Sequence, residues 1–230
     1  MRPSLALLSL LAASTAMSLD GNAVRRDLEN RYRRAKTLKA AFFEKYSDSH
    51  GGITAESGTV YFSRPGRMRW EYRSPQEKLF LVDGTNAWFY VPADRTASRA
   101  RMRESSDWRT PLALLAGKAN LSELCRKLEL WGGDSRAETP LAPGNSLLRC
   151  VLRDNPADNP PADTPVDVLL ETDPEAWLVR VVIRQPGNVE IEFRFGNWEE
   201  NVAIPEVKFH FQPPPGVAVV DEESLAGEIH

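Results

Sequence analysis

The sequence predicts a mainly β protein of the α+β class, built on one continuous antiparallel sheet with helices inserted at two places. Three observations lead to this prediction. After residue 40, short runs with a two-residue hydrophobic period fill most of the chain, and Gly- and Pro-rich turns join them. Apolar residues at helical spacing precede the first run, and helix start signals interrupt the runs near the middle. No repeat at a solenoid period is visible.

Residues 1–18 have the pattern of an export signal. Arg2 supplies the positive charge, Leu5 to Ala13 is an apolar run that includes Ser9, and small residues allow cleavage after Ala16 or Ser18. The apolar run is shorter than the ~20 residues that a membrane-spanning helix needs. We therefore expect residues 19–230 to form a single domain in an oxidising compartment, with no Cys near the cleavage site to carry a lipid.

The chain has two cysteines, Cys125 and Cys150. In an exported protein an even count favours a disulfide, although two separately buried thiols remain the alternative. A metal site is not expected, because His50, His210 and His230 do not stand at ligand spacing with either Cys. No cofactor motif is present.

An amphipathic helix is predicted to open the domain, with Asp20 or Asn22 as its cap. Charged residues surround its apolar face, so it should lie across an apolar surface. The face is formed by residues at helical spacing, namely Val24, Leu28, Tyr32, Ala35 and Leu38.

Strands follow with short turns between them. Alternation is strict in one of them, where Met68, Trp70 and Tyr72 share a face and basic or acidic residues share the other. The runs predicted as strands in the first half are 41–46, 58–63, 67–72, 78–82 and 86–91.

A helical interruption is predicted from Thr110 and Pro111 to Gly117, and a capping box at 120–123 starts a second short helix through about Lys127. Strands then return, and a Pro-rich loop occupies 154–165. The runs predicted as strands here are 147–153, 166–172, 177–184, 188–198 and 207–211, with 217–220 as a last edge strand.

The sheet carries many aromatic side chains, so one of its faces must be buried. Either the helices fill that face completely, or a ligand cavity remains beneath them. Catalysis is not expected, because the sequence has no nucleophile elbow, zinc-protease motif, P-loop or dinucleotide fingerprint. The net charge of −3 gives no indication of nucleic-acid binding.

Several segments resemble the LolA family, the periplasmic carriers of outer-membrane lipoproteins. The longest is GTVYFSRPGRMRWEY at 58–72. LKAAF at 38–42 precedes it, VDG at 82–84 and AWFY at 87–90 follow it, and FHFQPPPGV stands at 209–217. The TPL segment at 110–112 lies where the family has its lid helix. Together these segments extend over nearly all of the mature chain.

The resemblance implies an unclosed antiparallel β-barrel of about eleven strands, with helices forming a lid over a hydrophobic cavity on the concave face. It also implies a soluble periplasmic carrier that is a monomer and needs no cofactor. Such a carrier takes acylated lipoproteins from an inner-membrane lipoprotein-releasing ABC transporter and delivers them to an outer-membrane lipoprotein receptor. The receptor shares the fold, so the missing lipid-attachment Cys favours the carrier. A carrier or sensor of another envelope lipid, such as a phospholipid or glycolipid, is the alternative.

Site residues follow from strand parity and from the resemblance. Arg64 matches the family's latch, which donates hydrogen bonds to lid carbonyls in the empty carrier; an exposed turn Arg is the alternative reading. Leu112 and Leu115 are expected on the lid. The cavity wall is expected to consist of Val60, Phe62, Met68, Trp70, Tyr72, Phe80 and Trp88.

Overall fold

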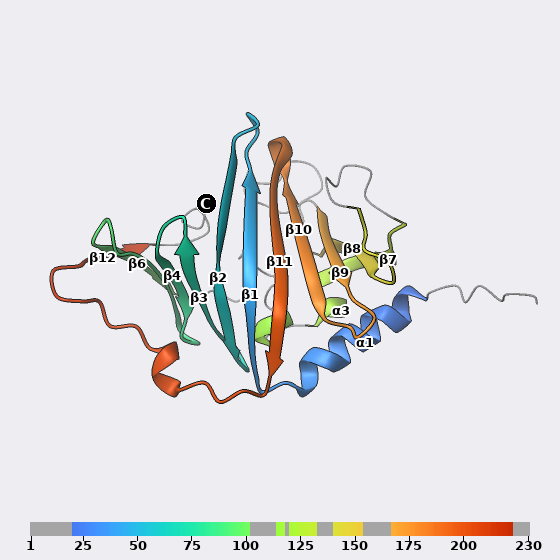
Figure 1. The fold of residues 1–230 in the computed structure, drawn as a ribbon, viewed down its shortest axis with the longest axis horizontal. Helices are drawn as coiled ribbons and strands as arrows, with labels where there is room; N and C mark the ends of the chain where they lie inside the picture. Colours follow the sequence, from blue (N-terminus) through green and yellow to red (C-terminus); the bar gives the residue numbers. More distant parts are fainter. Residues whose placement is uncertain (1–19, 102–113, 118–119, 133–139, 154–166, 223–230) are drawn as a thin grey trace, which may run out of the picture.

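The computed structural model describes residues 20–101, 114–117, 120–132, 140–153 and 167–222. Within them, twelve strands form a single sheet in the order β12-β6-β5-β4-β3-β2-β1-β11-β10-β9-β8-β7 (Figure 1). Its two outermost strands, β12 and β7, do not pair with each other, so the sheet is unclosed. The segments expected to form the signal peptide and the Pro-rich loop lie outside the described residues.

The first six strands form a meander in which each strand pairs with the next in antiparallel fashion. The first five match the predicted runs, although the first begins at Thr37 rather than residue 41, and the second begins at Ile53 rather than residue 58, toward their shared hairpin. The sixth was not predicted, because its small and charged residues show no hydrophobic period. The strands are β1 (Thr37–Ser47), β2 (Ile53–Ser63), β3 (Arg67–Ser74), β4 (Lys78–Val82), β5 (Asn86–Val91) and β6 (Thr96–Arg101).

A second meander returns the chain to the middle of the sheet, where its last strand pairs with β1 and joins the two halves (Figure 1). The strands are β7 (Cys125–Leu130), β8 (Ser146–Leu152), β9 (Asp167–Thr172), β10 (Leu178–Gln185) and β11 (Val189–Glu200). The edge strand β12 (Ala218–Glu222) pairs with β6 in parallel, so one pair departs from the expected antiparallel pattern.

The predicted second short helix is wrong in its length. Asn120 and Glu123 form the expected capping box, but α3 (Leu121–Leu124) ends after one turn and β7 begins at Cys125. A helix of one turn has little intrinsic stability. The ladder between β7 and β8 satisfies the backbone better, so pairing outweighs the local helix signal.

The predicted strand at 207–211 is also wrong. This segment contains the 3₁₀ turn η2 (Glu206–Phe209), which lies against β3 and buries Phe209. A second 3₁₀ turn, η1 (Pro186–Asn188), connects β10 to β11. Because the C-terminal segment crosses the sheet before β12, it cannot pair as a neighbouring strand.

The N-terminal helix α1 (Gly21–Arg34) is capped by Asp20, whose carboxylate accepts a hydrogen bond from the Asn22 amide. It contacts β7 and β8 and crosses one end of the sheet (Figure 1). Leu28 and Tyr32, which belong to the predicted apolar face of the helix, are buried against the sheet. Leu38, however, lies in β1 rather than on the helix, because the backbone there pairs with both β2 and β11.

The sheet has two unlike faces. The inner face, covered by α1 and by residues 114–117 and 120–124, belongs to the main hydrophobic cluster. The outer face carries two smaller clusters, one around Leu81 and Phe209 and one around Leu169 and Val182. The alternation of strand side chains explains why neighbouring residues enter different clusters.

Cys125 and Cys150 form a disulfide, which confirms the predicted pairing. It joins the start of β7 to β8 and encloses a chain separation of 25 residues. We expect the Cys125→Ser/Cys150→Ser variant to lose about 3 kcal/mol of unfolding free energy, because its unfolded chain is less constrained. Urea unfolding checks this value. Adding a reductant should lower wild-type stability and leave the double variant unchanged; equal sensitivity of both proteins would contradict the prediction.

Candidate functional site

The candidate site is the aromatic wall, which we define as the inner-face side chains of β1 to β5 and β11. Six of the seven residues predicted for a cavity wall lie there, buried in one cluster. They are Val60, Phe62, Met68, Trp70, Tyr72 and Phe80. The register places them side by side, because Val60 pairs with Trp70, Phe62 with Met68, and Trp70 with Phe80.

Trp70 lies at the centre of this wall. Its ring centroid is 4.8 Å from that of Phe42 and 5.4 Å from that of Phe193, and Phe62 and Phe195 are also in ring contact. Sequence reasoning did not assign Phe42, Phe193 or Phe195 to the wall. Their alternate positions in β1 and β11 were a usable signal, but which face they occupied depended on the pairing of these distant strands.

Trp88 does not belong to the wall, and its prediction is corrected. It packs on the outer face against Phe211, with ring centroids 5.3 Å apart, and its indole N–H donates to Asp83. The register explains the difference. Phe80 pairs with Phe89, so Phe89 is the β5 side chain that shares the inner face.

Short helical segments cover the wall. Leu114, Leu115, Ala116 and Leu121 are buried in the same cluster as the wall residues. Leu115 therefore occupies a covering position, as predicted, whereas Leu112 lies outside the described residues. Trp70 is only 2% exposed, so the described structure is a closed arrangement.

Arg64, in the turn between β2 and β3, contacts residues 114–117, which we call the covering segment. Its guanidinium donates to the Leu114 carbonyl at 3.4 Å and to the Ala35 carbonyl, at the end of α1, at 3.5 Å. In the same turn the Gly66 amide donates to the Ala116 carbonyl at 2.7 Å. Burial lowers the pKa of the Arg64 guanidinium, and the nearby Tyr32 partly opposes this shift. The turn thus ties together α1 and residues 114–116.

The contacts of α1 with the sheet are more extensive. Tyr32 is fully buried between Trp177 and Trp198, and its hydroxyl accepts a hydrogen bond from the Leu178 amide at 2.9 Å. Burial raises the pKa of this hydroxyl well above its ordinary value, so it stays protonated. Arg31 donates twice to the Glu175 carbonyl and lies over the Trp177 ring. These contacts fix α1 to β10 and β11.

Polar side chains lie at the hairpin end of the inner face. The Tyr72 hydroxyl donates to Glu44 at 2.8 Å, and Lys78 pairs with Glu56 at 2.6 Å. Glu44 and Glu56 occupy opposite positions on β1 and β2. The wall is therefore apolar toward the Arg64 end and polar toward the β1–β2 hairpin.

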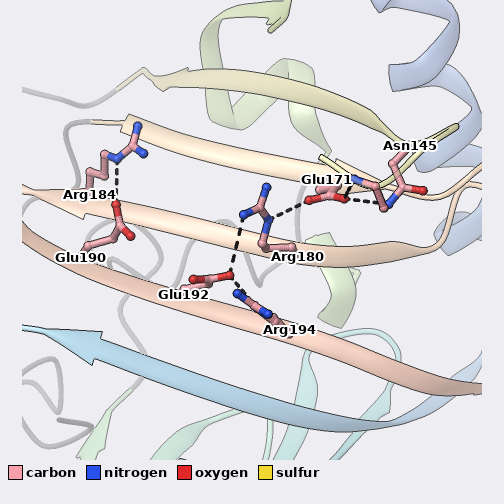
Figure 2. Close-up of polar contacts among 8 residues, drawn as sticks. Asn145, Glu171, Arg180, Arg184, Glu190, Glu192 and Arg194 are labelled. Carbon is pink, nitrogen blue, oxygen red and sulfur yellow. Dashed lines mark hydrogen bonds and ion pairs between the residues drawn. The ribbon is translucent and has the colours of Figure 1, made fainter. Parts of the chain in front are cut away.

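A ladder of charged side chains crosses the outer face of β9, β10 and β11 (Figure 2). Arg180 donates to Glu171 at 2.7 Å and lies 3.8 Å from Glu192, which also accepts from Arg194. Asn145 donates to Glu171 from the segment that precedes β8. Each carboxylate thus has a positively charged partner, so the ladder has the features of a buried structural network.

Within the described residues, no group of three His, Cys, Asp or Glu side chains is placed to hold a metal ion. None of the helices in this part of the chain is long and apolar enough to cross a membrane. What the site offers chemically is an extended apolar surface beneath covering segments.

An unclosed sheet that buries an aromatic inner face beneath short helices places this chain in the class of half-barrel proteins. A solved structure of an uncharacterised conserved protein from Thermus thermophilus shares this fold, with a TM-score of 0.52 and 11% identity over 87% of this chain and 98% of that one. A LolA superfamily protein from Nitrosomonas europaea matches with a TM-score of 0.44 and 9% identity, covering 84% of this chain and 99% of that one.

Sequence comparison defines the family within this class. The family model described as outer membrane lipoprotein carrier protein LolA matches residues 33–128. An outer-membrane lipoprotein carrier protein from Nitrosospira multiformis is 30% identical over 222 residues, which cover 94% of this chain and 95% of the relative. The chain belongs to the LolA family, as its sequence motifs indicated.

Proposed function

We propose that this protein is a periplasmic, non-enzymatic carrier that holds the acyl chains of lipoproteins against the aromatic wall. The observation that carries the proposal is the wall itself, a continuous apolar surface on the inner face of an unclosed sheet. Fatty acyl chains cost ~0.8 kcal/mol per CH₂ when exposed to water, so a carrier must bury them. Membership of the LolA family supports lipoproteins as the cargo.

The closed arrangement supports a proposal for how the carrier works. The wall is covered, so acyl chains can enter only if the covering segment that includes residues 114–116 moves away. Opening costs free energy, which lowers the net affinity for cargo and allows release. We propose that a lipoprotein-releasing ABC transporter loads the carrier and that an outer-membrane receptor with a more favourable cavity unloads it. Residues 1–18 would direct a monomeric product to the periplasm.

Native mass spectrometry of the protein purified from periplasm tests this function. We expect bound species whose masses match triacylated lipoproteins, and the adducts should be lost when the acyl chains are extracted. Adducts that match phospholipids or glycolipids would favour the alternative cargo. A protein that carries no lipid after purification, and takes none from micelles of a triacylated peptide, would sink the proposal.

Arg64→Leu tests the latch that we propose for this residue. The variant should retain a triacylated peptide during transfer to acceptor vesicles, because the closed empty state loses the bonds to Leu114 and Ala35. Both bonds are long for a charged donor, at 3.5 Å and 3.4 Å, so we assign each about 1 kcal/mol. Release should therefore slow by roughly 5- to 30-fold. Release kinetics followed by fluorescence measure this.

Arg69→Leu is the matched control for the latch. Arg69 lies in the neighbouring strand but pairs with Glu71 on the outer face. Its substitution should leave release unchanged. If both variants and the wild type release the peptide at equal rates, the latch role of Arg64 is contradicted. The proposal that the wall holds acyl chains would not be affected.

A further inference from the structure

Gly117 ends the covering segment directly over the guanidinium of Arg64. It follows the helical residues 114–116 with a φ of +73°, and its amide donates to the Leu114 carbonyl. A Cβ atom at this position would lie 2.7 Å from Nη2 and 2.8 Å from Cζ of Arg64, and closer still to Nε. Carbon atoms do not approach so closely, so a side chain at 117 and the guanidinium cannot both keep these positions.

Arg64 has little room to adjust while it keeps its contacts. Its guanidinium reaches carbonyls in two different segments, those of Ala35 and Leu114. The backbone on either side is tied as well, because the Arg64 amide donates to Lys36 and the Gly66 amide donates to Ala116. The guanidinium is thus enclosed between the end of α1 and the covering segment.

The hydrogen bonds of Arg64 do not by themselves determine its place. Both guanidinium bonds are long, at 3.4 Å and 3.5 Å, and the buried Nε has no hydrogen-bond partner within the described part of the chain. A buried donor without a partner costs free energy. The position of Arg64 therefore depends on the space that Gly117 leaves open.

We propose that Gly117 is a positioning residue for the closed lid. Its missing side chain allows the Arg64 guanidinium to reach the Leu114 and Ala35 carbonyls while the covering segment stays docked on Gly66. A side chain at 117 displaces the flexible end of Arg64, which weakens the closed state and makes the carrier retain its cargo. This role rests on the proposed carrier function and specifies how the closed state of the same site is maintained.

Gly117→Ala tests the role, and Gly187→Ala is its matched control. Gly187 has nearly the same φ, +76°, but nothing lies within 4 Å of a Cβ built there. Both substitutions therefore strain the backbone, and only the first meets Arg64. We expect Gly117→Ala to slow release of a dansylated triacylated peptide to phosphatidylcholine vesicles by roughly 5-fold or more. Gly187→Ala should release it at the wild-type rate, and equal rates for the two variants would overturn the proposal.

A double variant separates positioning from backbone strain. In the Arg64→Ala background no guanidinium remains to be displaced, so adding Gly117→Ala should slow release no more than adding Gly187→Ala does. An effect of Gly117→Ala that persists in this background would show that it acts without Arg64 and would refute the role. If Gly117→Ala alone does not fold, recovery of folding in the double variant supports the role, and failure to recover refutes it.

Amide hydrogen exchange gives a readout that needs no lipid. Gly117→Ala should accelerate exchange of the Gly66 amide, which bonds to the Ala116 carbonyl in the closed structure, whereas Gly187→Ala should not. In the Arg64→Ala background the two glycine substitutions should give equal exchange at Gly66. A wild-type protein that binds no acylated peptide would refute the carrier function. The exchange data would then still decide whether Gly117 positions Arg64.

Discussion

Trp70→Ala is expected to lower the free energy of unfolding by about 3–5 kcal/mol, the range found for large aromatic residues replaced in a packed core. Trp70 is 2% exposed and contacts the rings of Phe42, Phe62, Phe193 and Phe195. Its removal therefore leaves a cavity bordered by strands from both halves of the sheet. Urea unfolding followed by circular dichroism measures the loss.

Phe43→Ala is the control for Trp70→Ala, because Phe43 lies in the same sheet with 41% of its surface exposed. Its substitution should change stability by no more than about 0.5 kcal/mol. If Trp70→Ala does not fold, Trp70→Leu keeps part of the volume and should lose less stability. A Trp70→Ala variant as stable as Phe43→Ala would show that the wall is not tightly packed.

Arg180→Met is expected to destabilise the protein by a similar amount, about 3–5 kcal/mol, because it breaks a buried ion pair. The Arg180 side chain is 7% exposed, and the Glu171 side chain that it contacts is 6% exposed. Figure 2 shows Glu171 between Arg180 and Asn145, so in the variant it would keep the contact with Asn145 but lose the cation beside it. A carboxylate left in this place without Arg180 is poorly solvated. Urea unfolding at neutral pH measures the cost.

Two comparisons test this explanation. Arg99→Met removes the exposed pair with Asp221, with an Arg99 side chain that is 42% exposed, and should cost less than about 1 kcal/mol. Arg180→Met/Glu171→Leu removes both charges and should be more stable than Arg180→Met alone. If the double variant is less stable than Arg180→Met, Glu171 stabilises the sheet even without Arg180. The unpaired charge would then not explain the loss of stability in Arg180→Met.

The sequence predicted most strands because their alternation is a local property. Met68, Trp70 and Tyr72 share a face in any strand that contains them, and the capping box of α3 needs only adjacent residues. The strands that escaped prediction, β6 and β7, have small or charged residues and gain their stability from pairing with β5 and β8. Backbone pairing with a neighbouring strand leaves no hydrophobic period in such short segments.

The assignment of residues to the wall could not be completed from the sequence where a strand is apolar on both faces. In β4 and β5 every face carries apolar residues, so parity alone could not decide between Trp88 and Phe89. The C-terminal segment decided it, since Phe209 and Phe211 cover the outer face and create a second cluster there. That segment follows β5 by more than a hundred residues.

The sequence by itself determined the mainly β class, the family, the disulfide partners and the alternation that forms most of the wall, because these depend on composition and near neighbours. The tertiary structure alone decided which face of β5 is inner, that β12 joins in parallel, and that Gly117 lies over Arg64. These relations join residues far apart in the chain. They are set by strand pairing and packing, and a local sequence pattern does not show which distant segments come into contact.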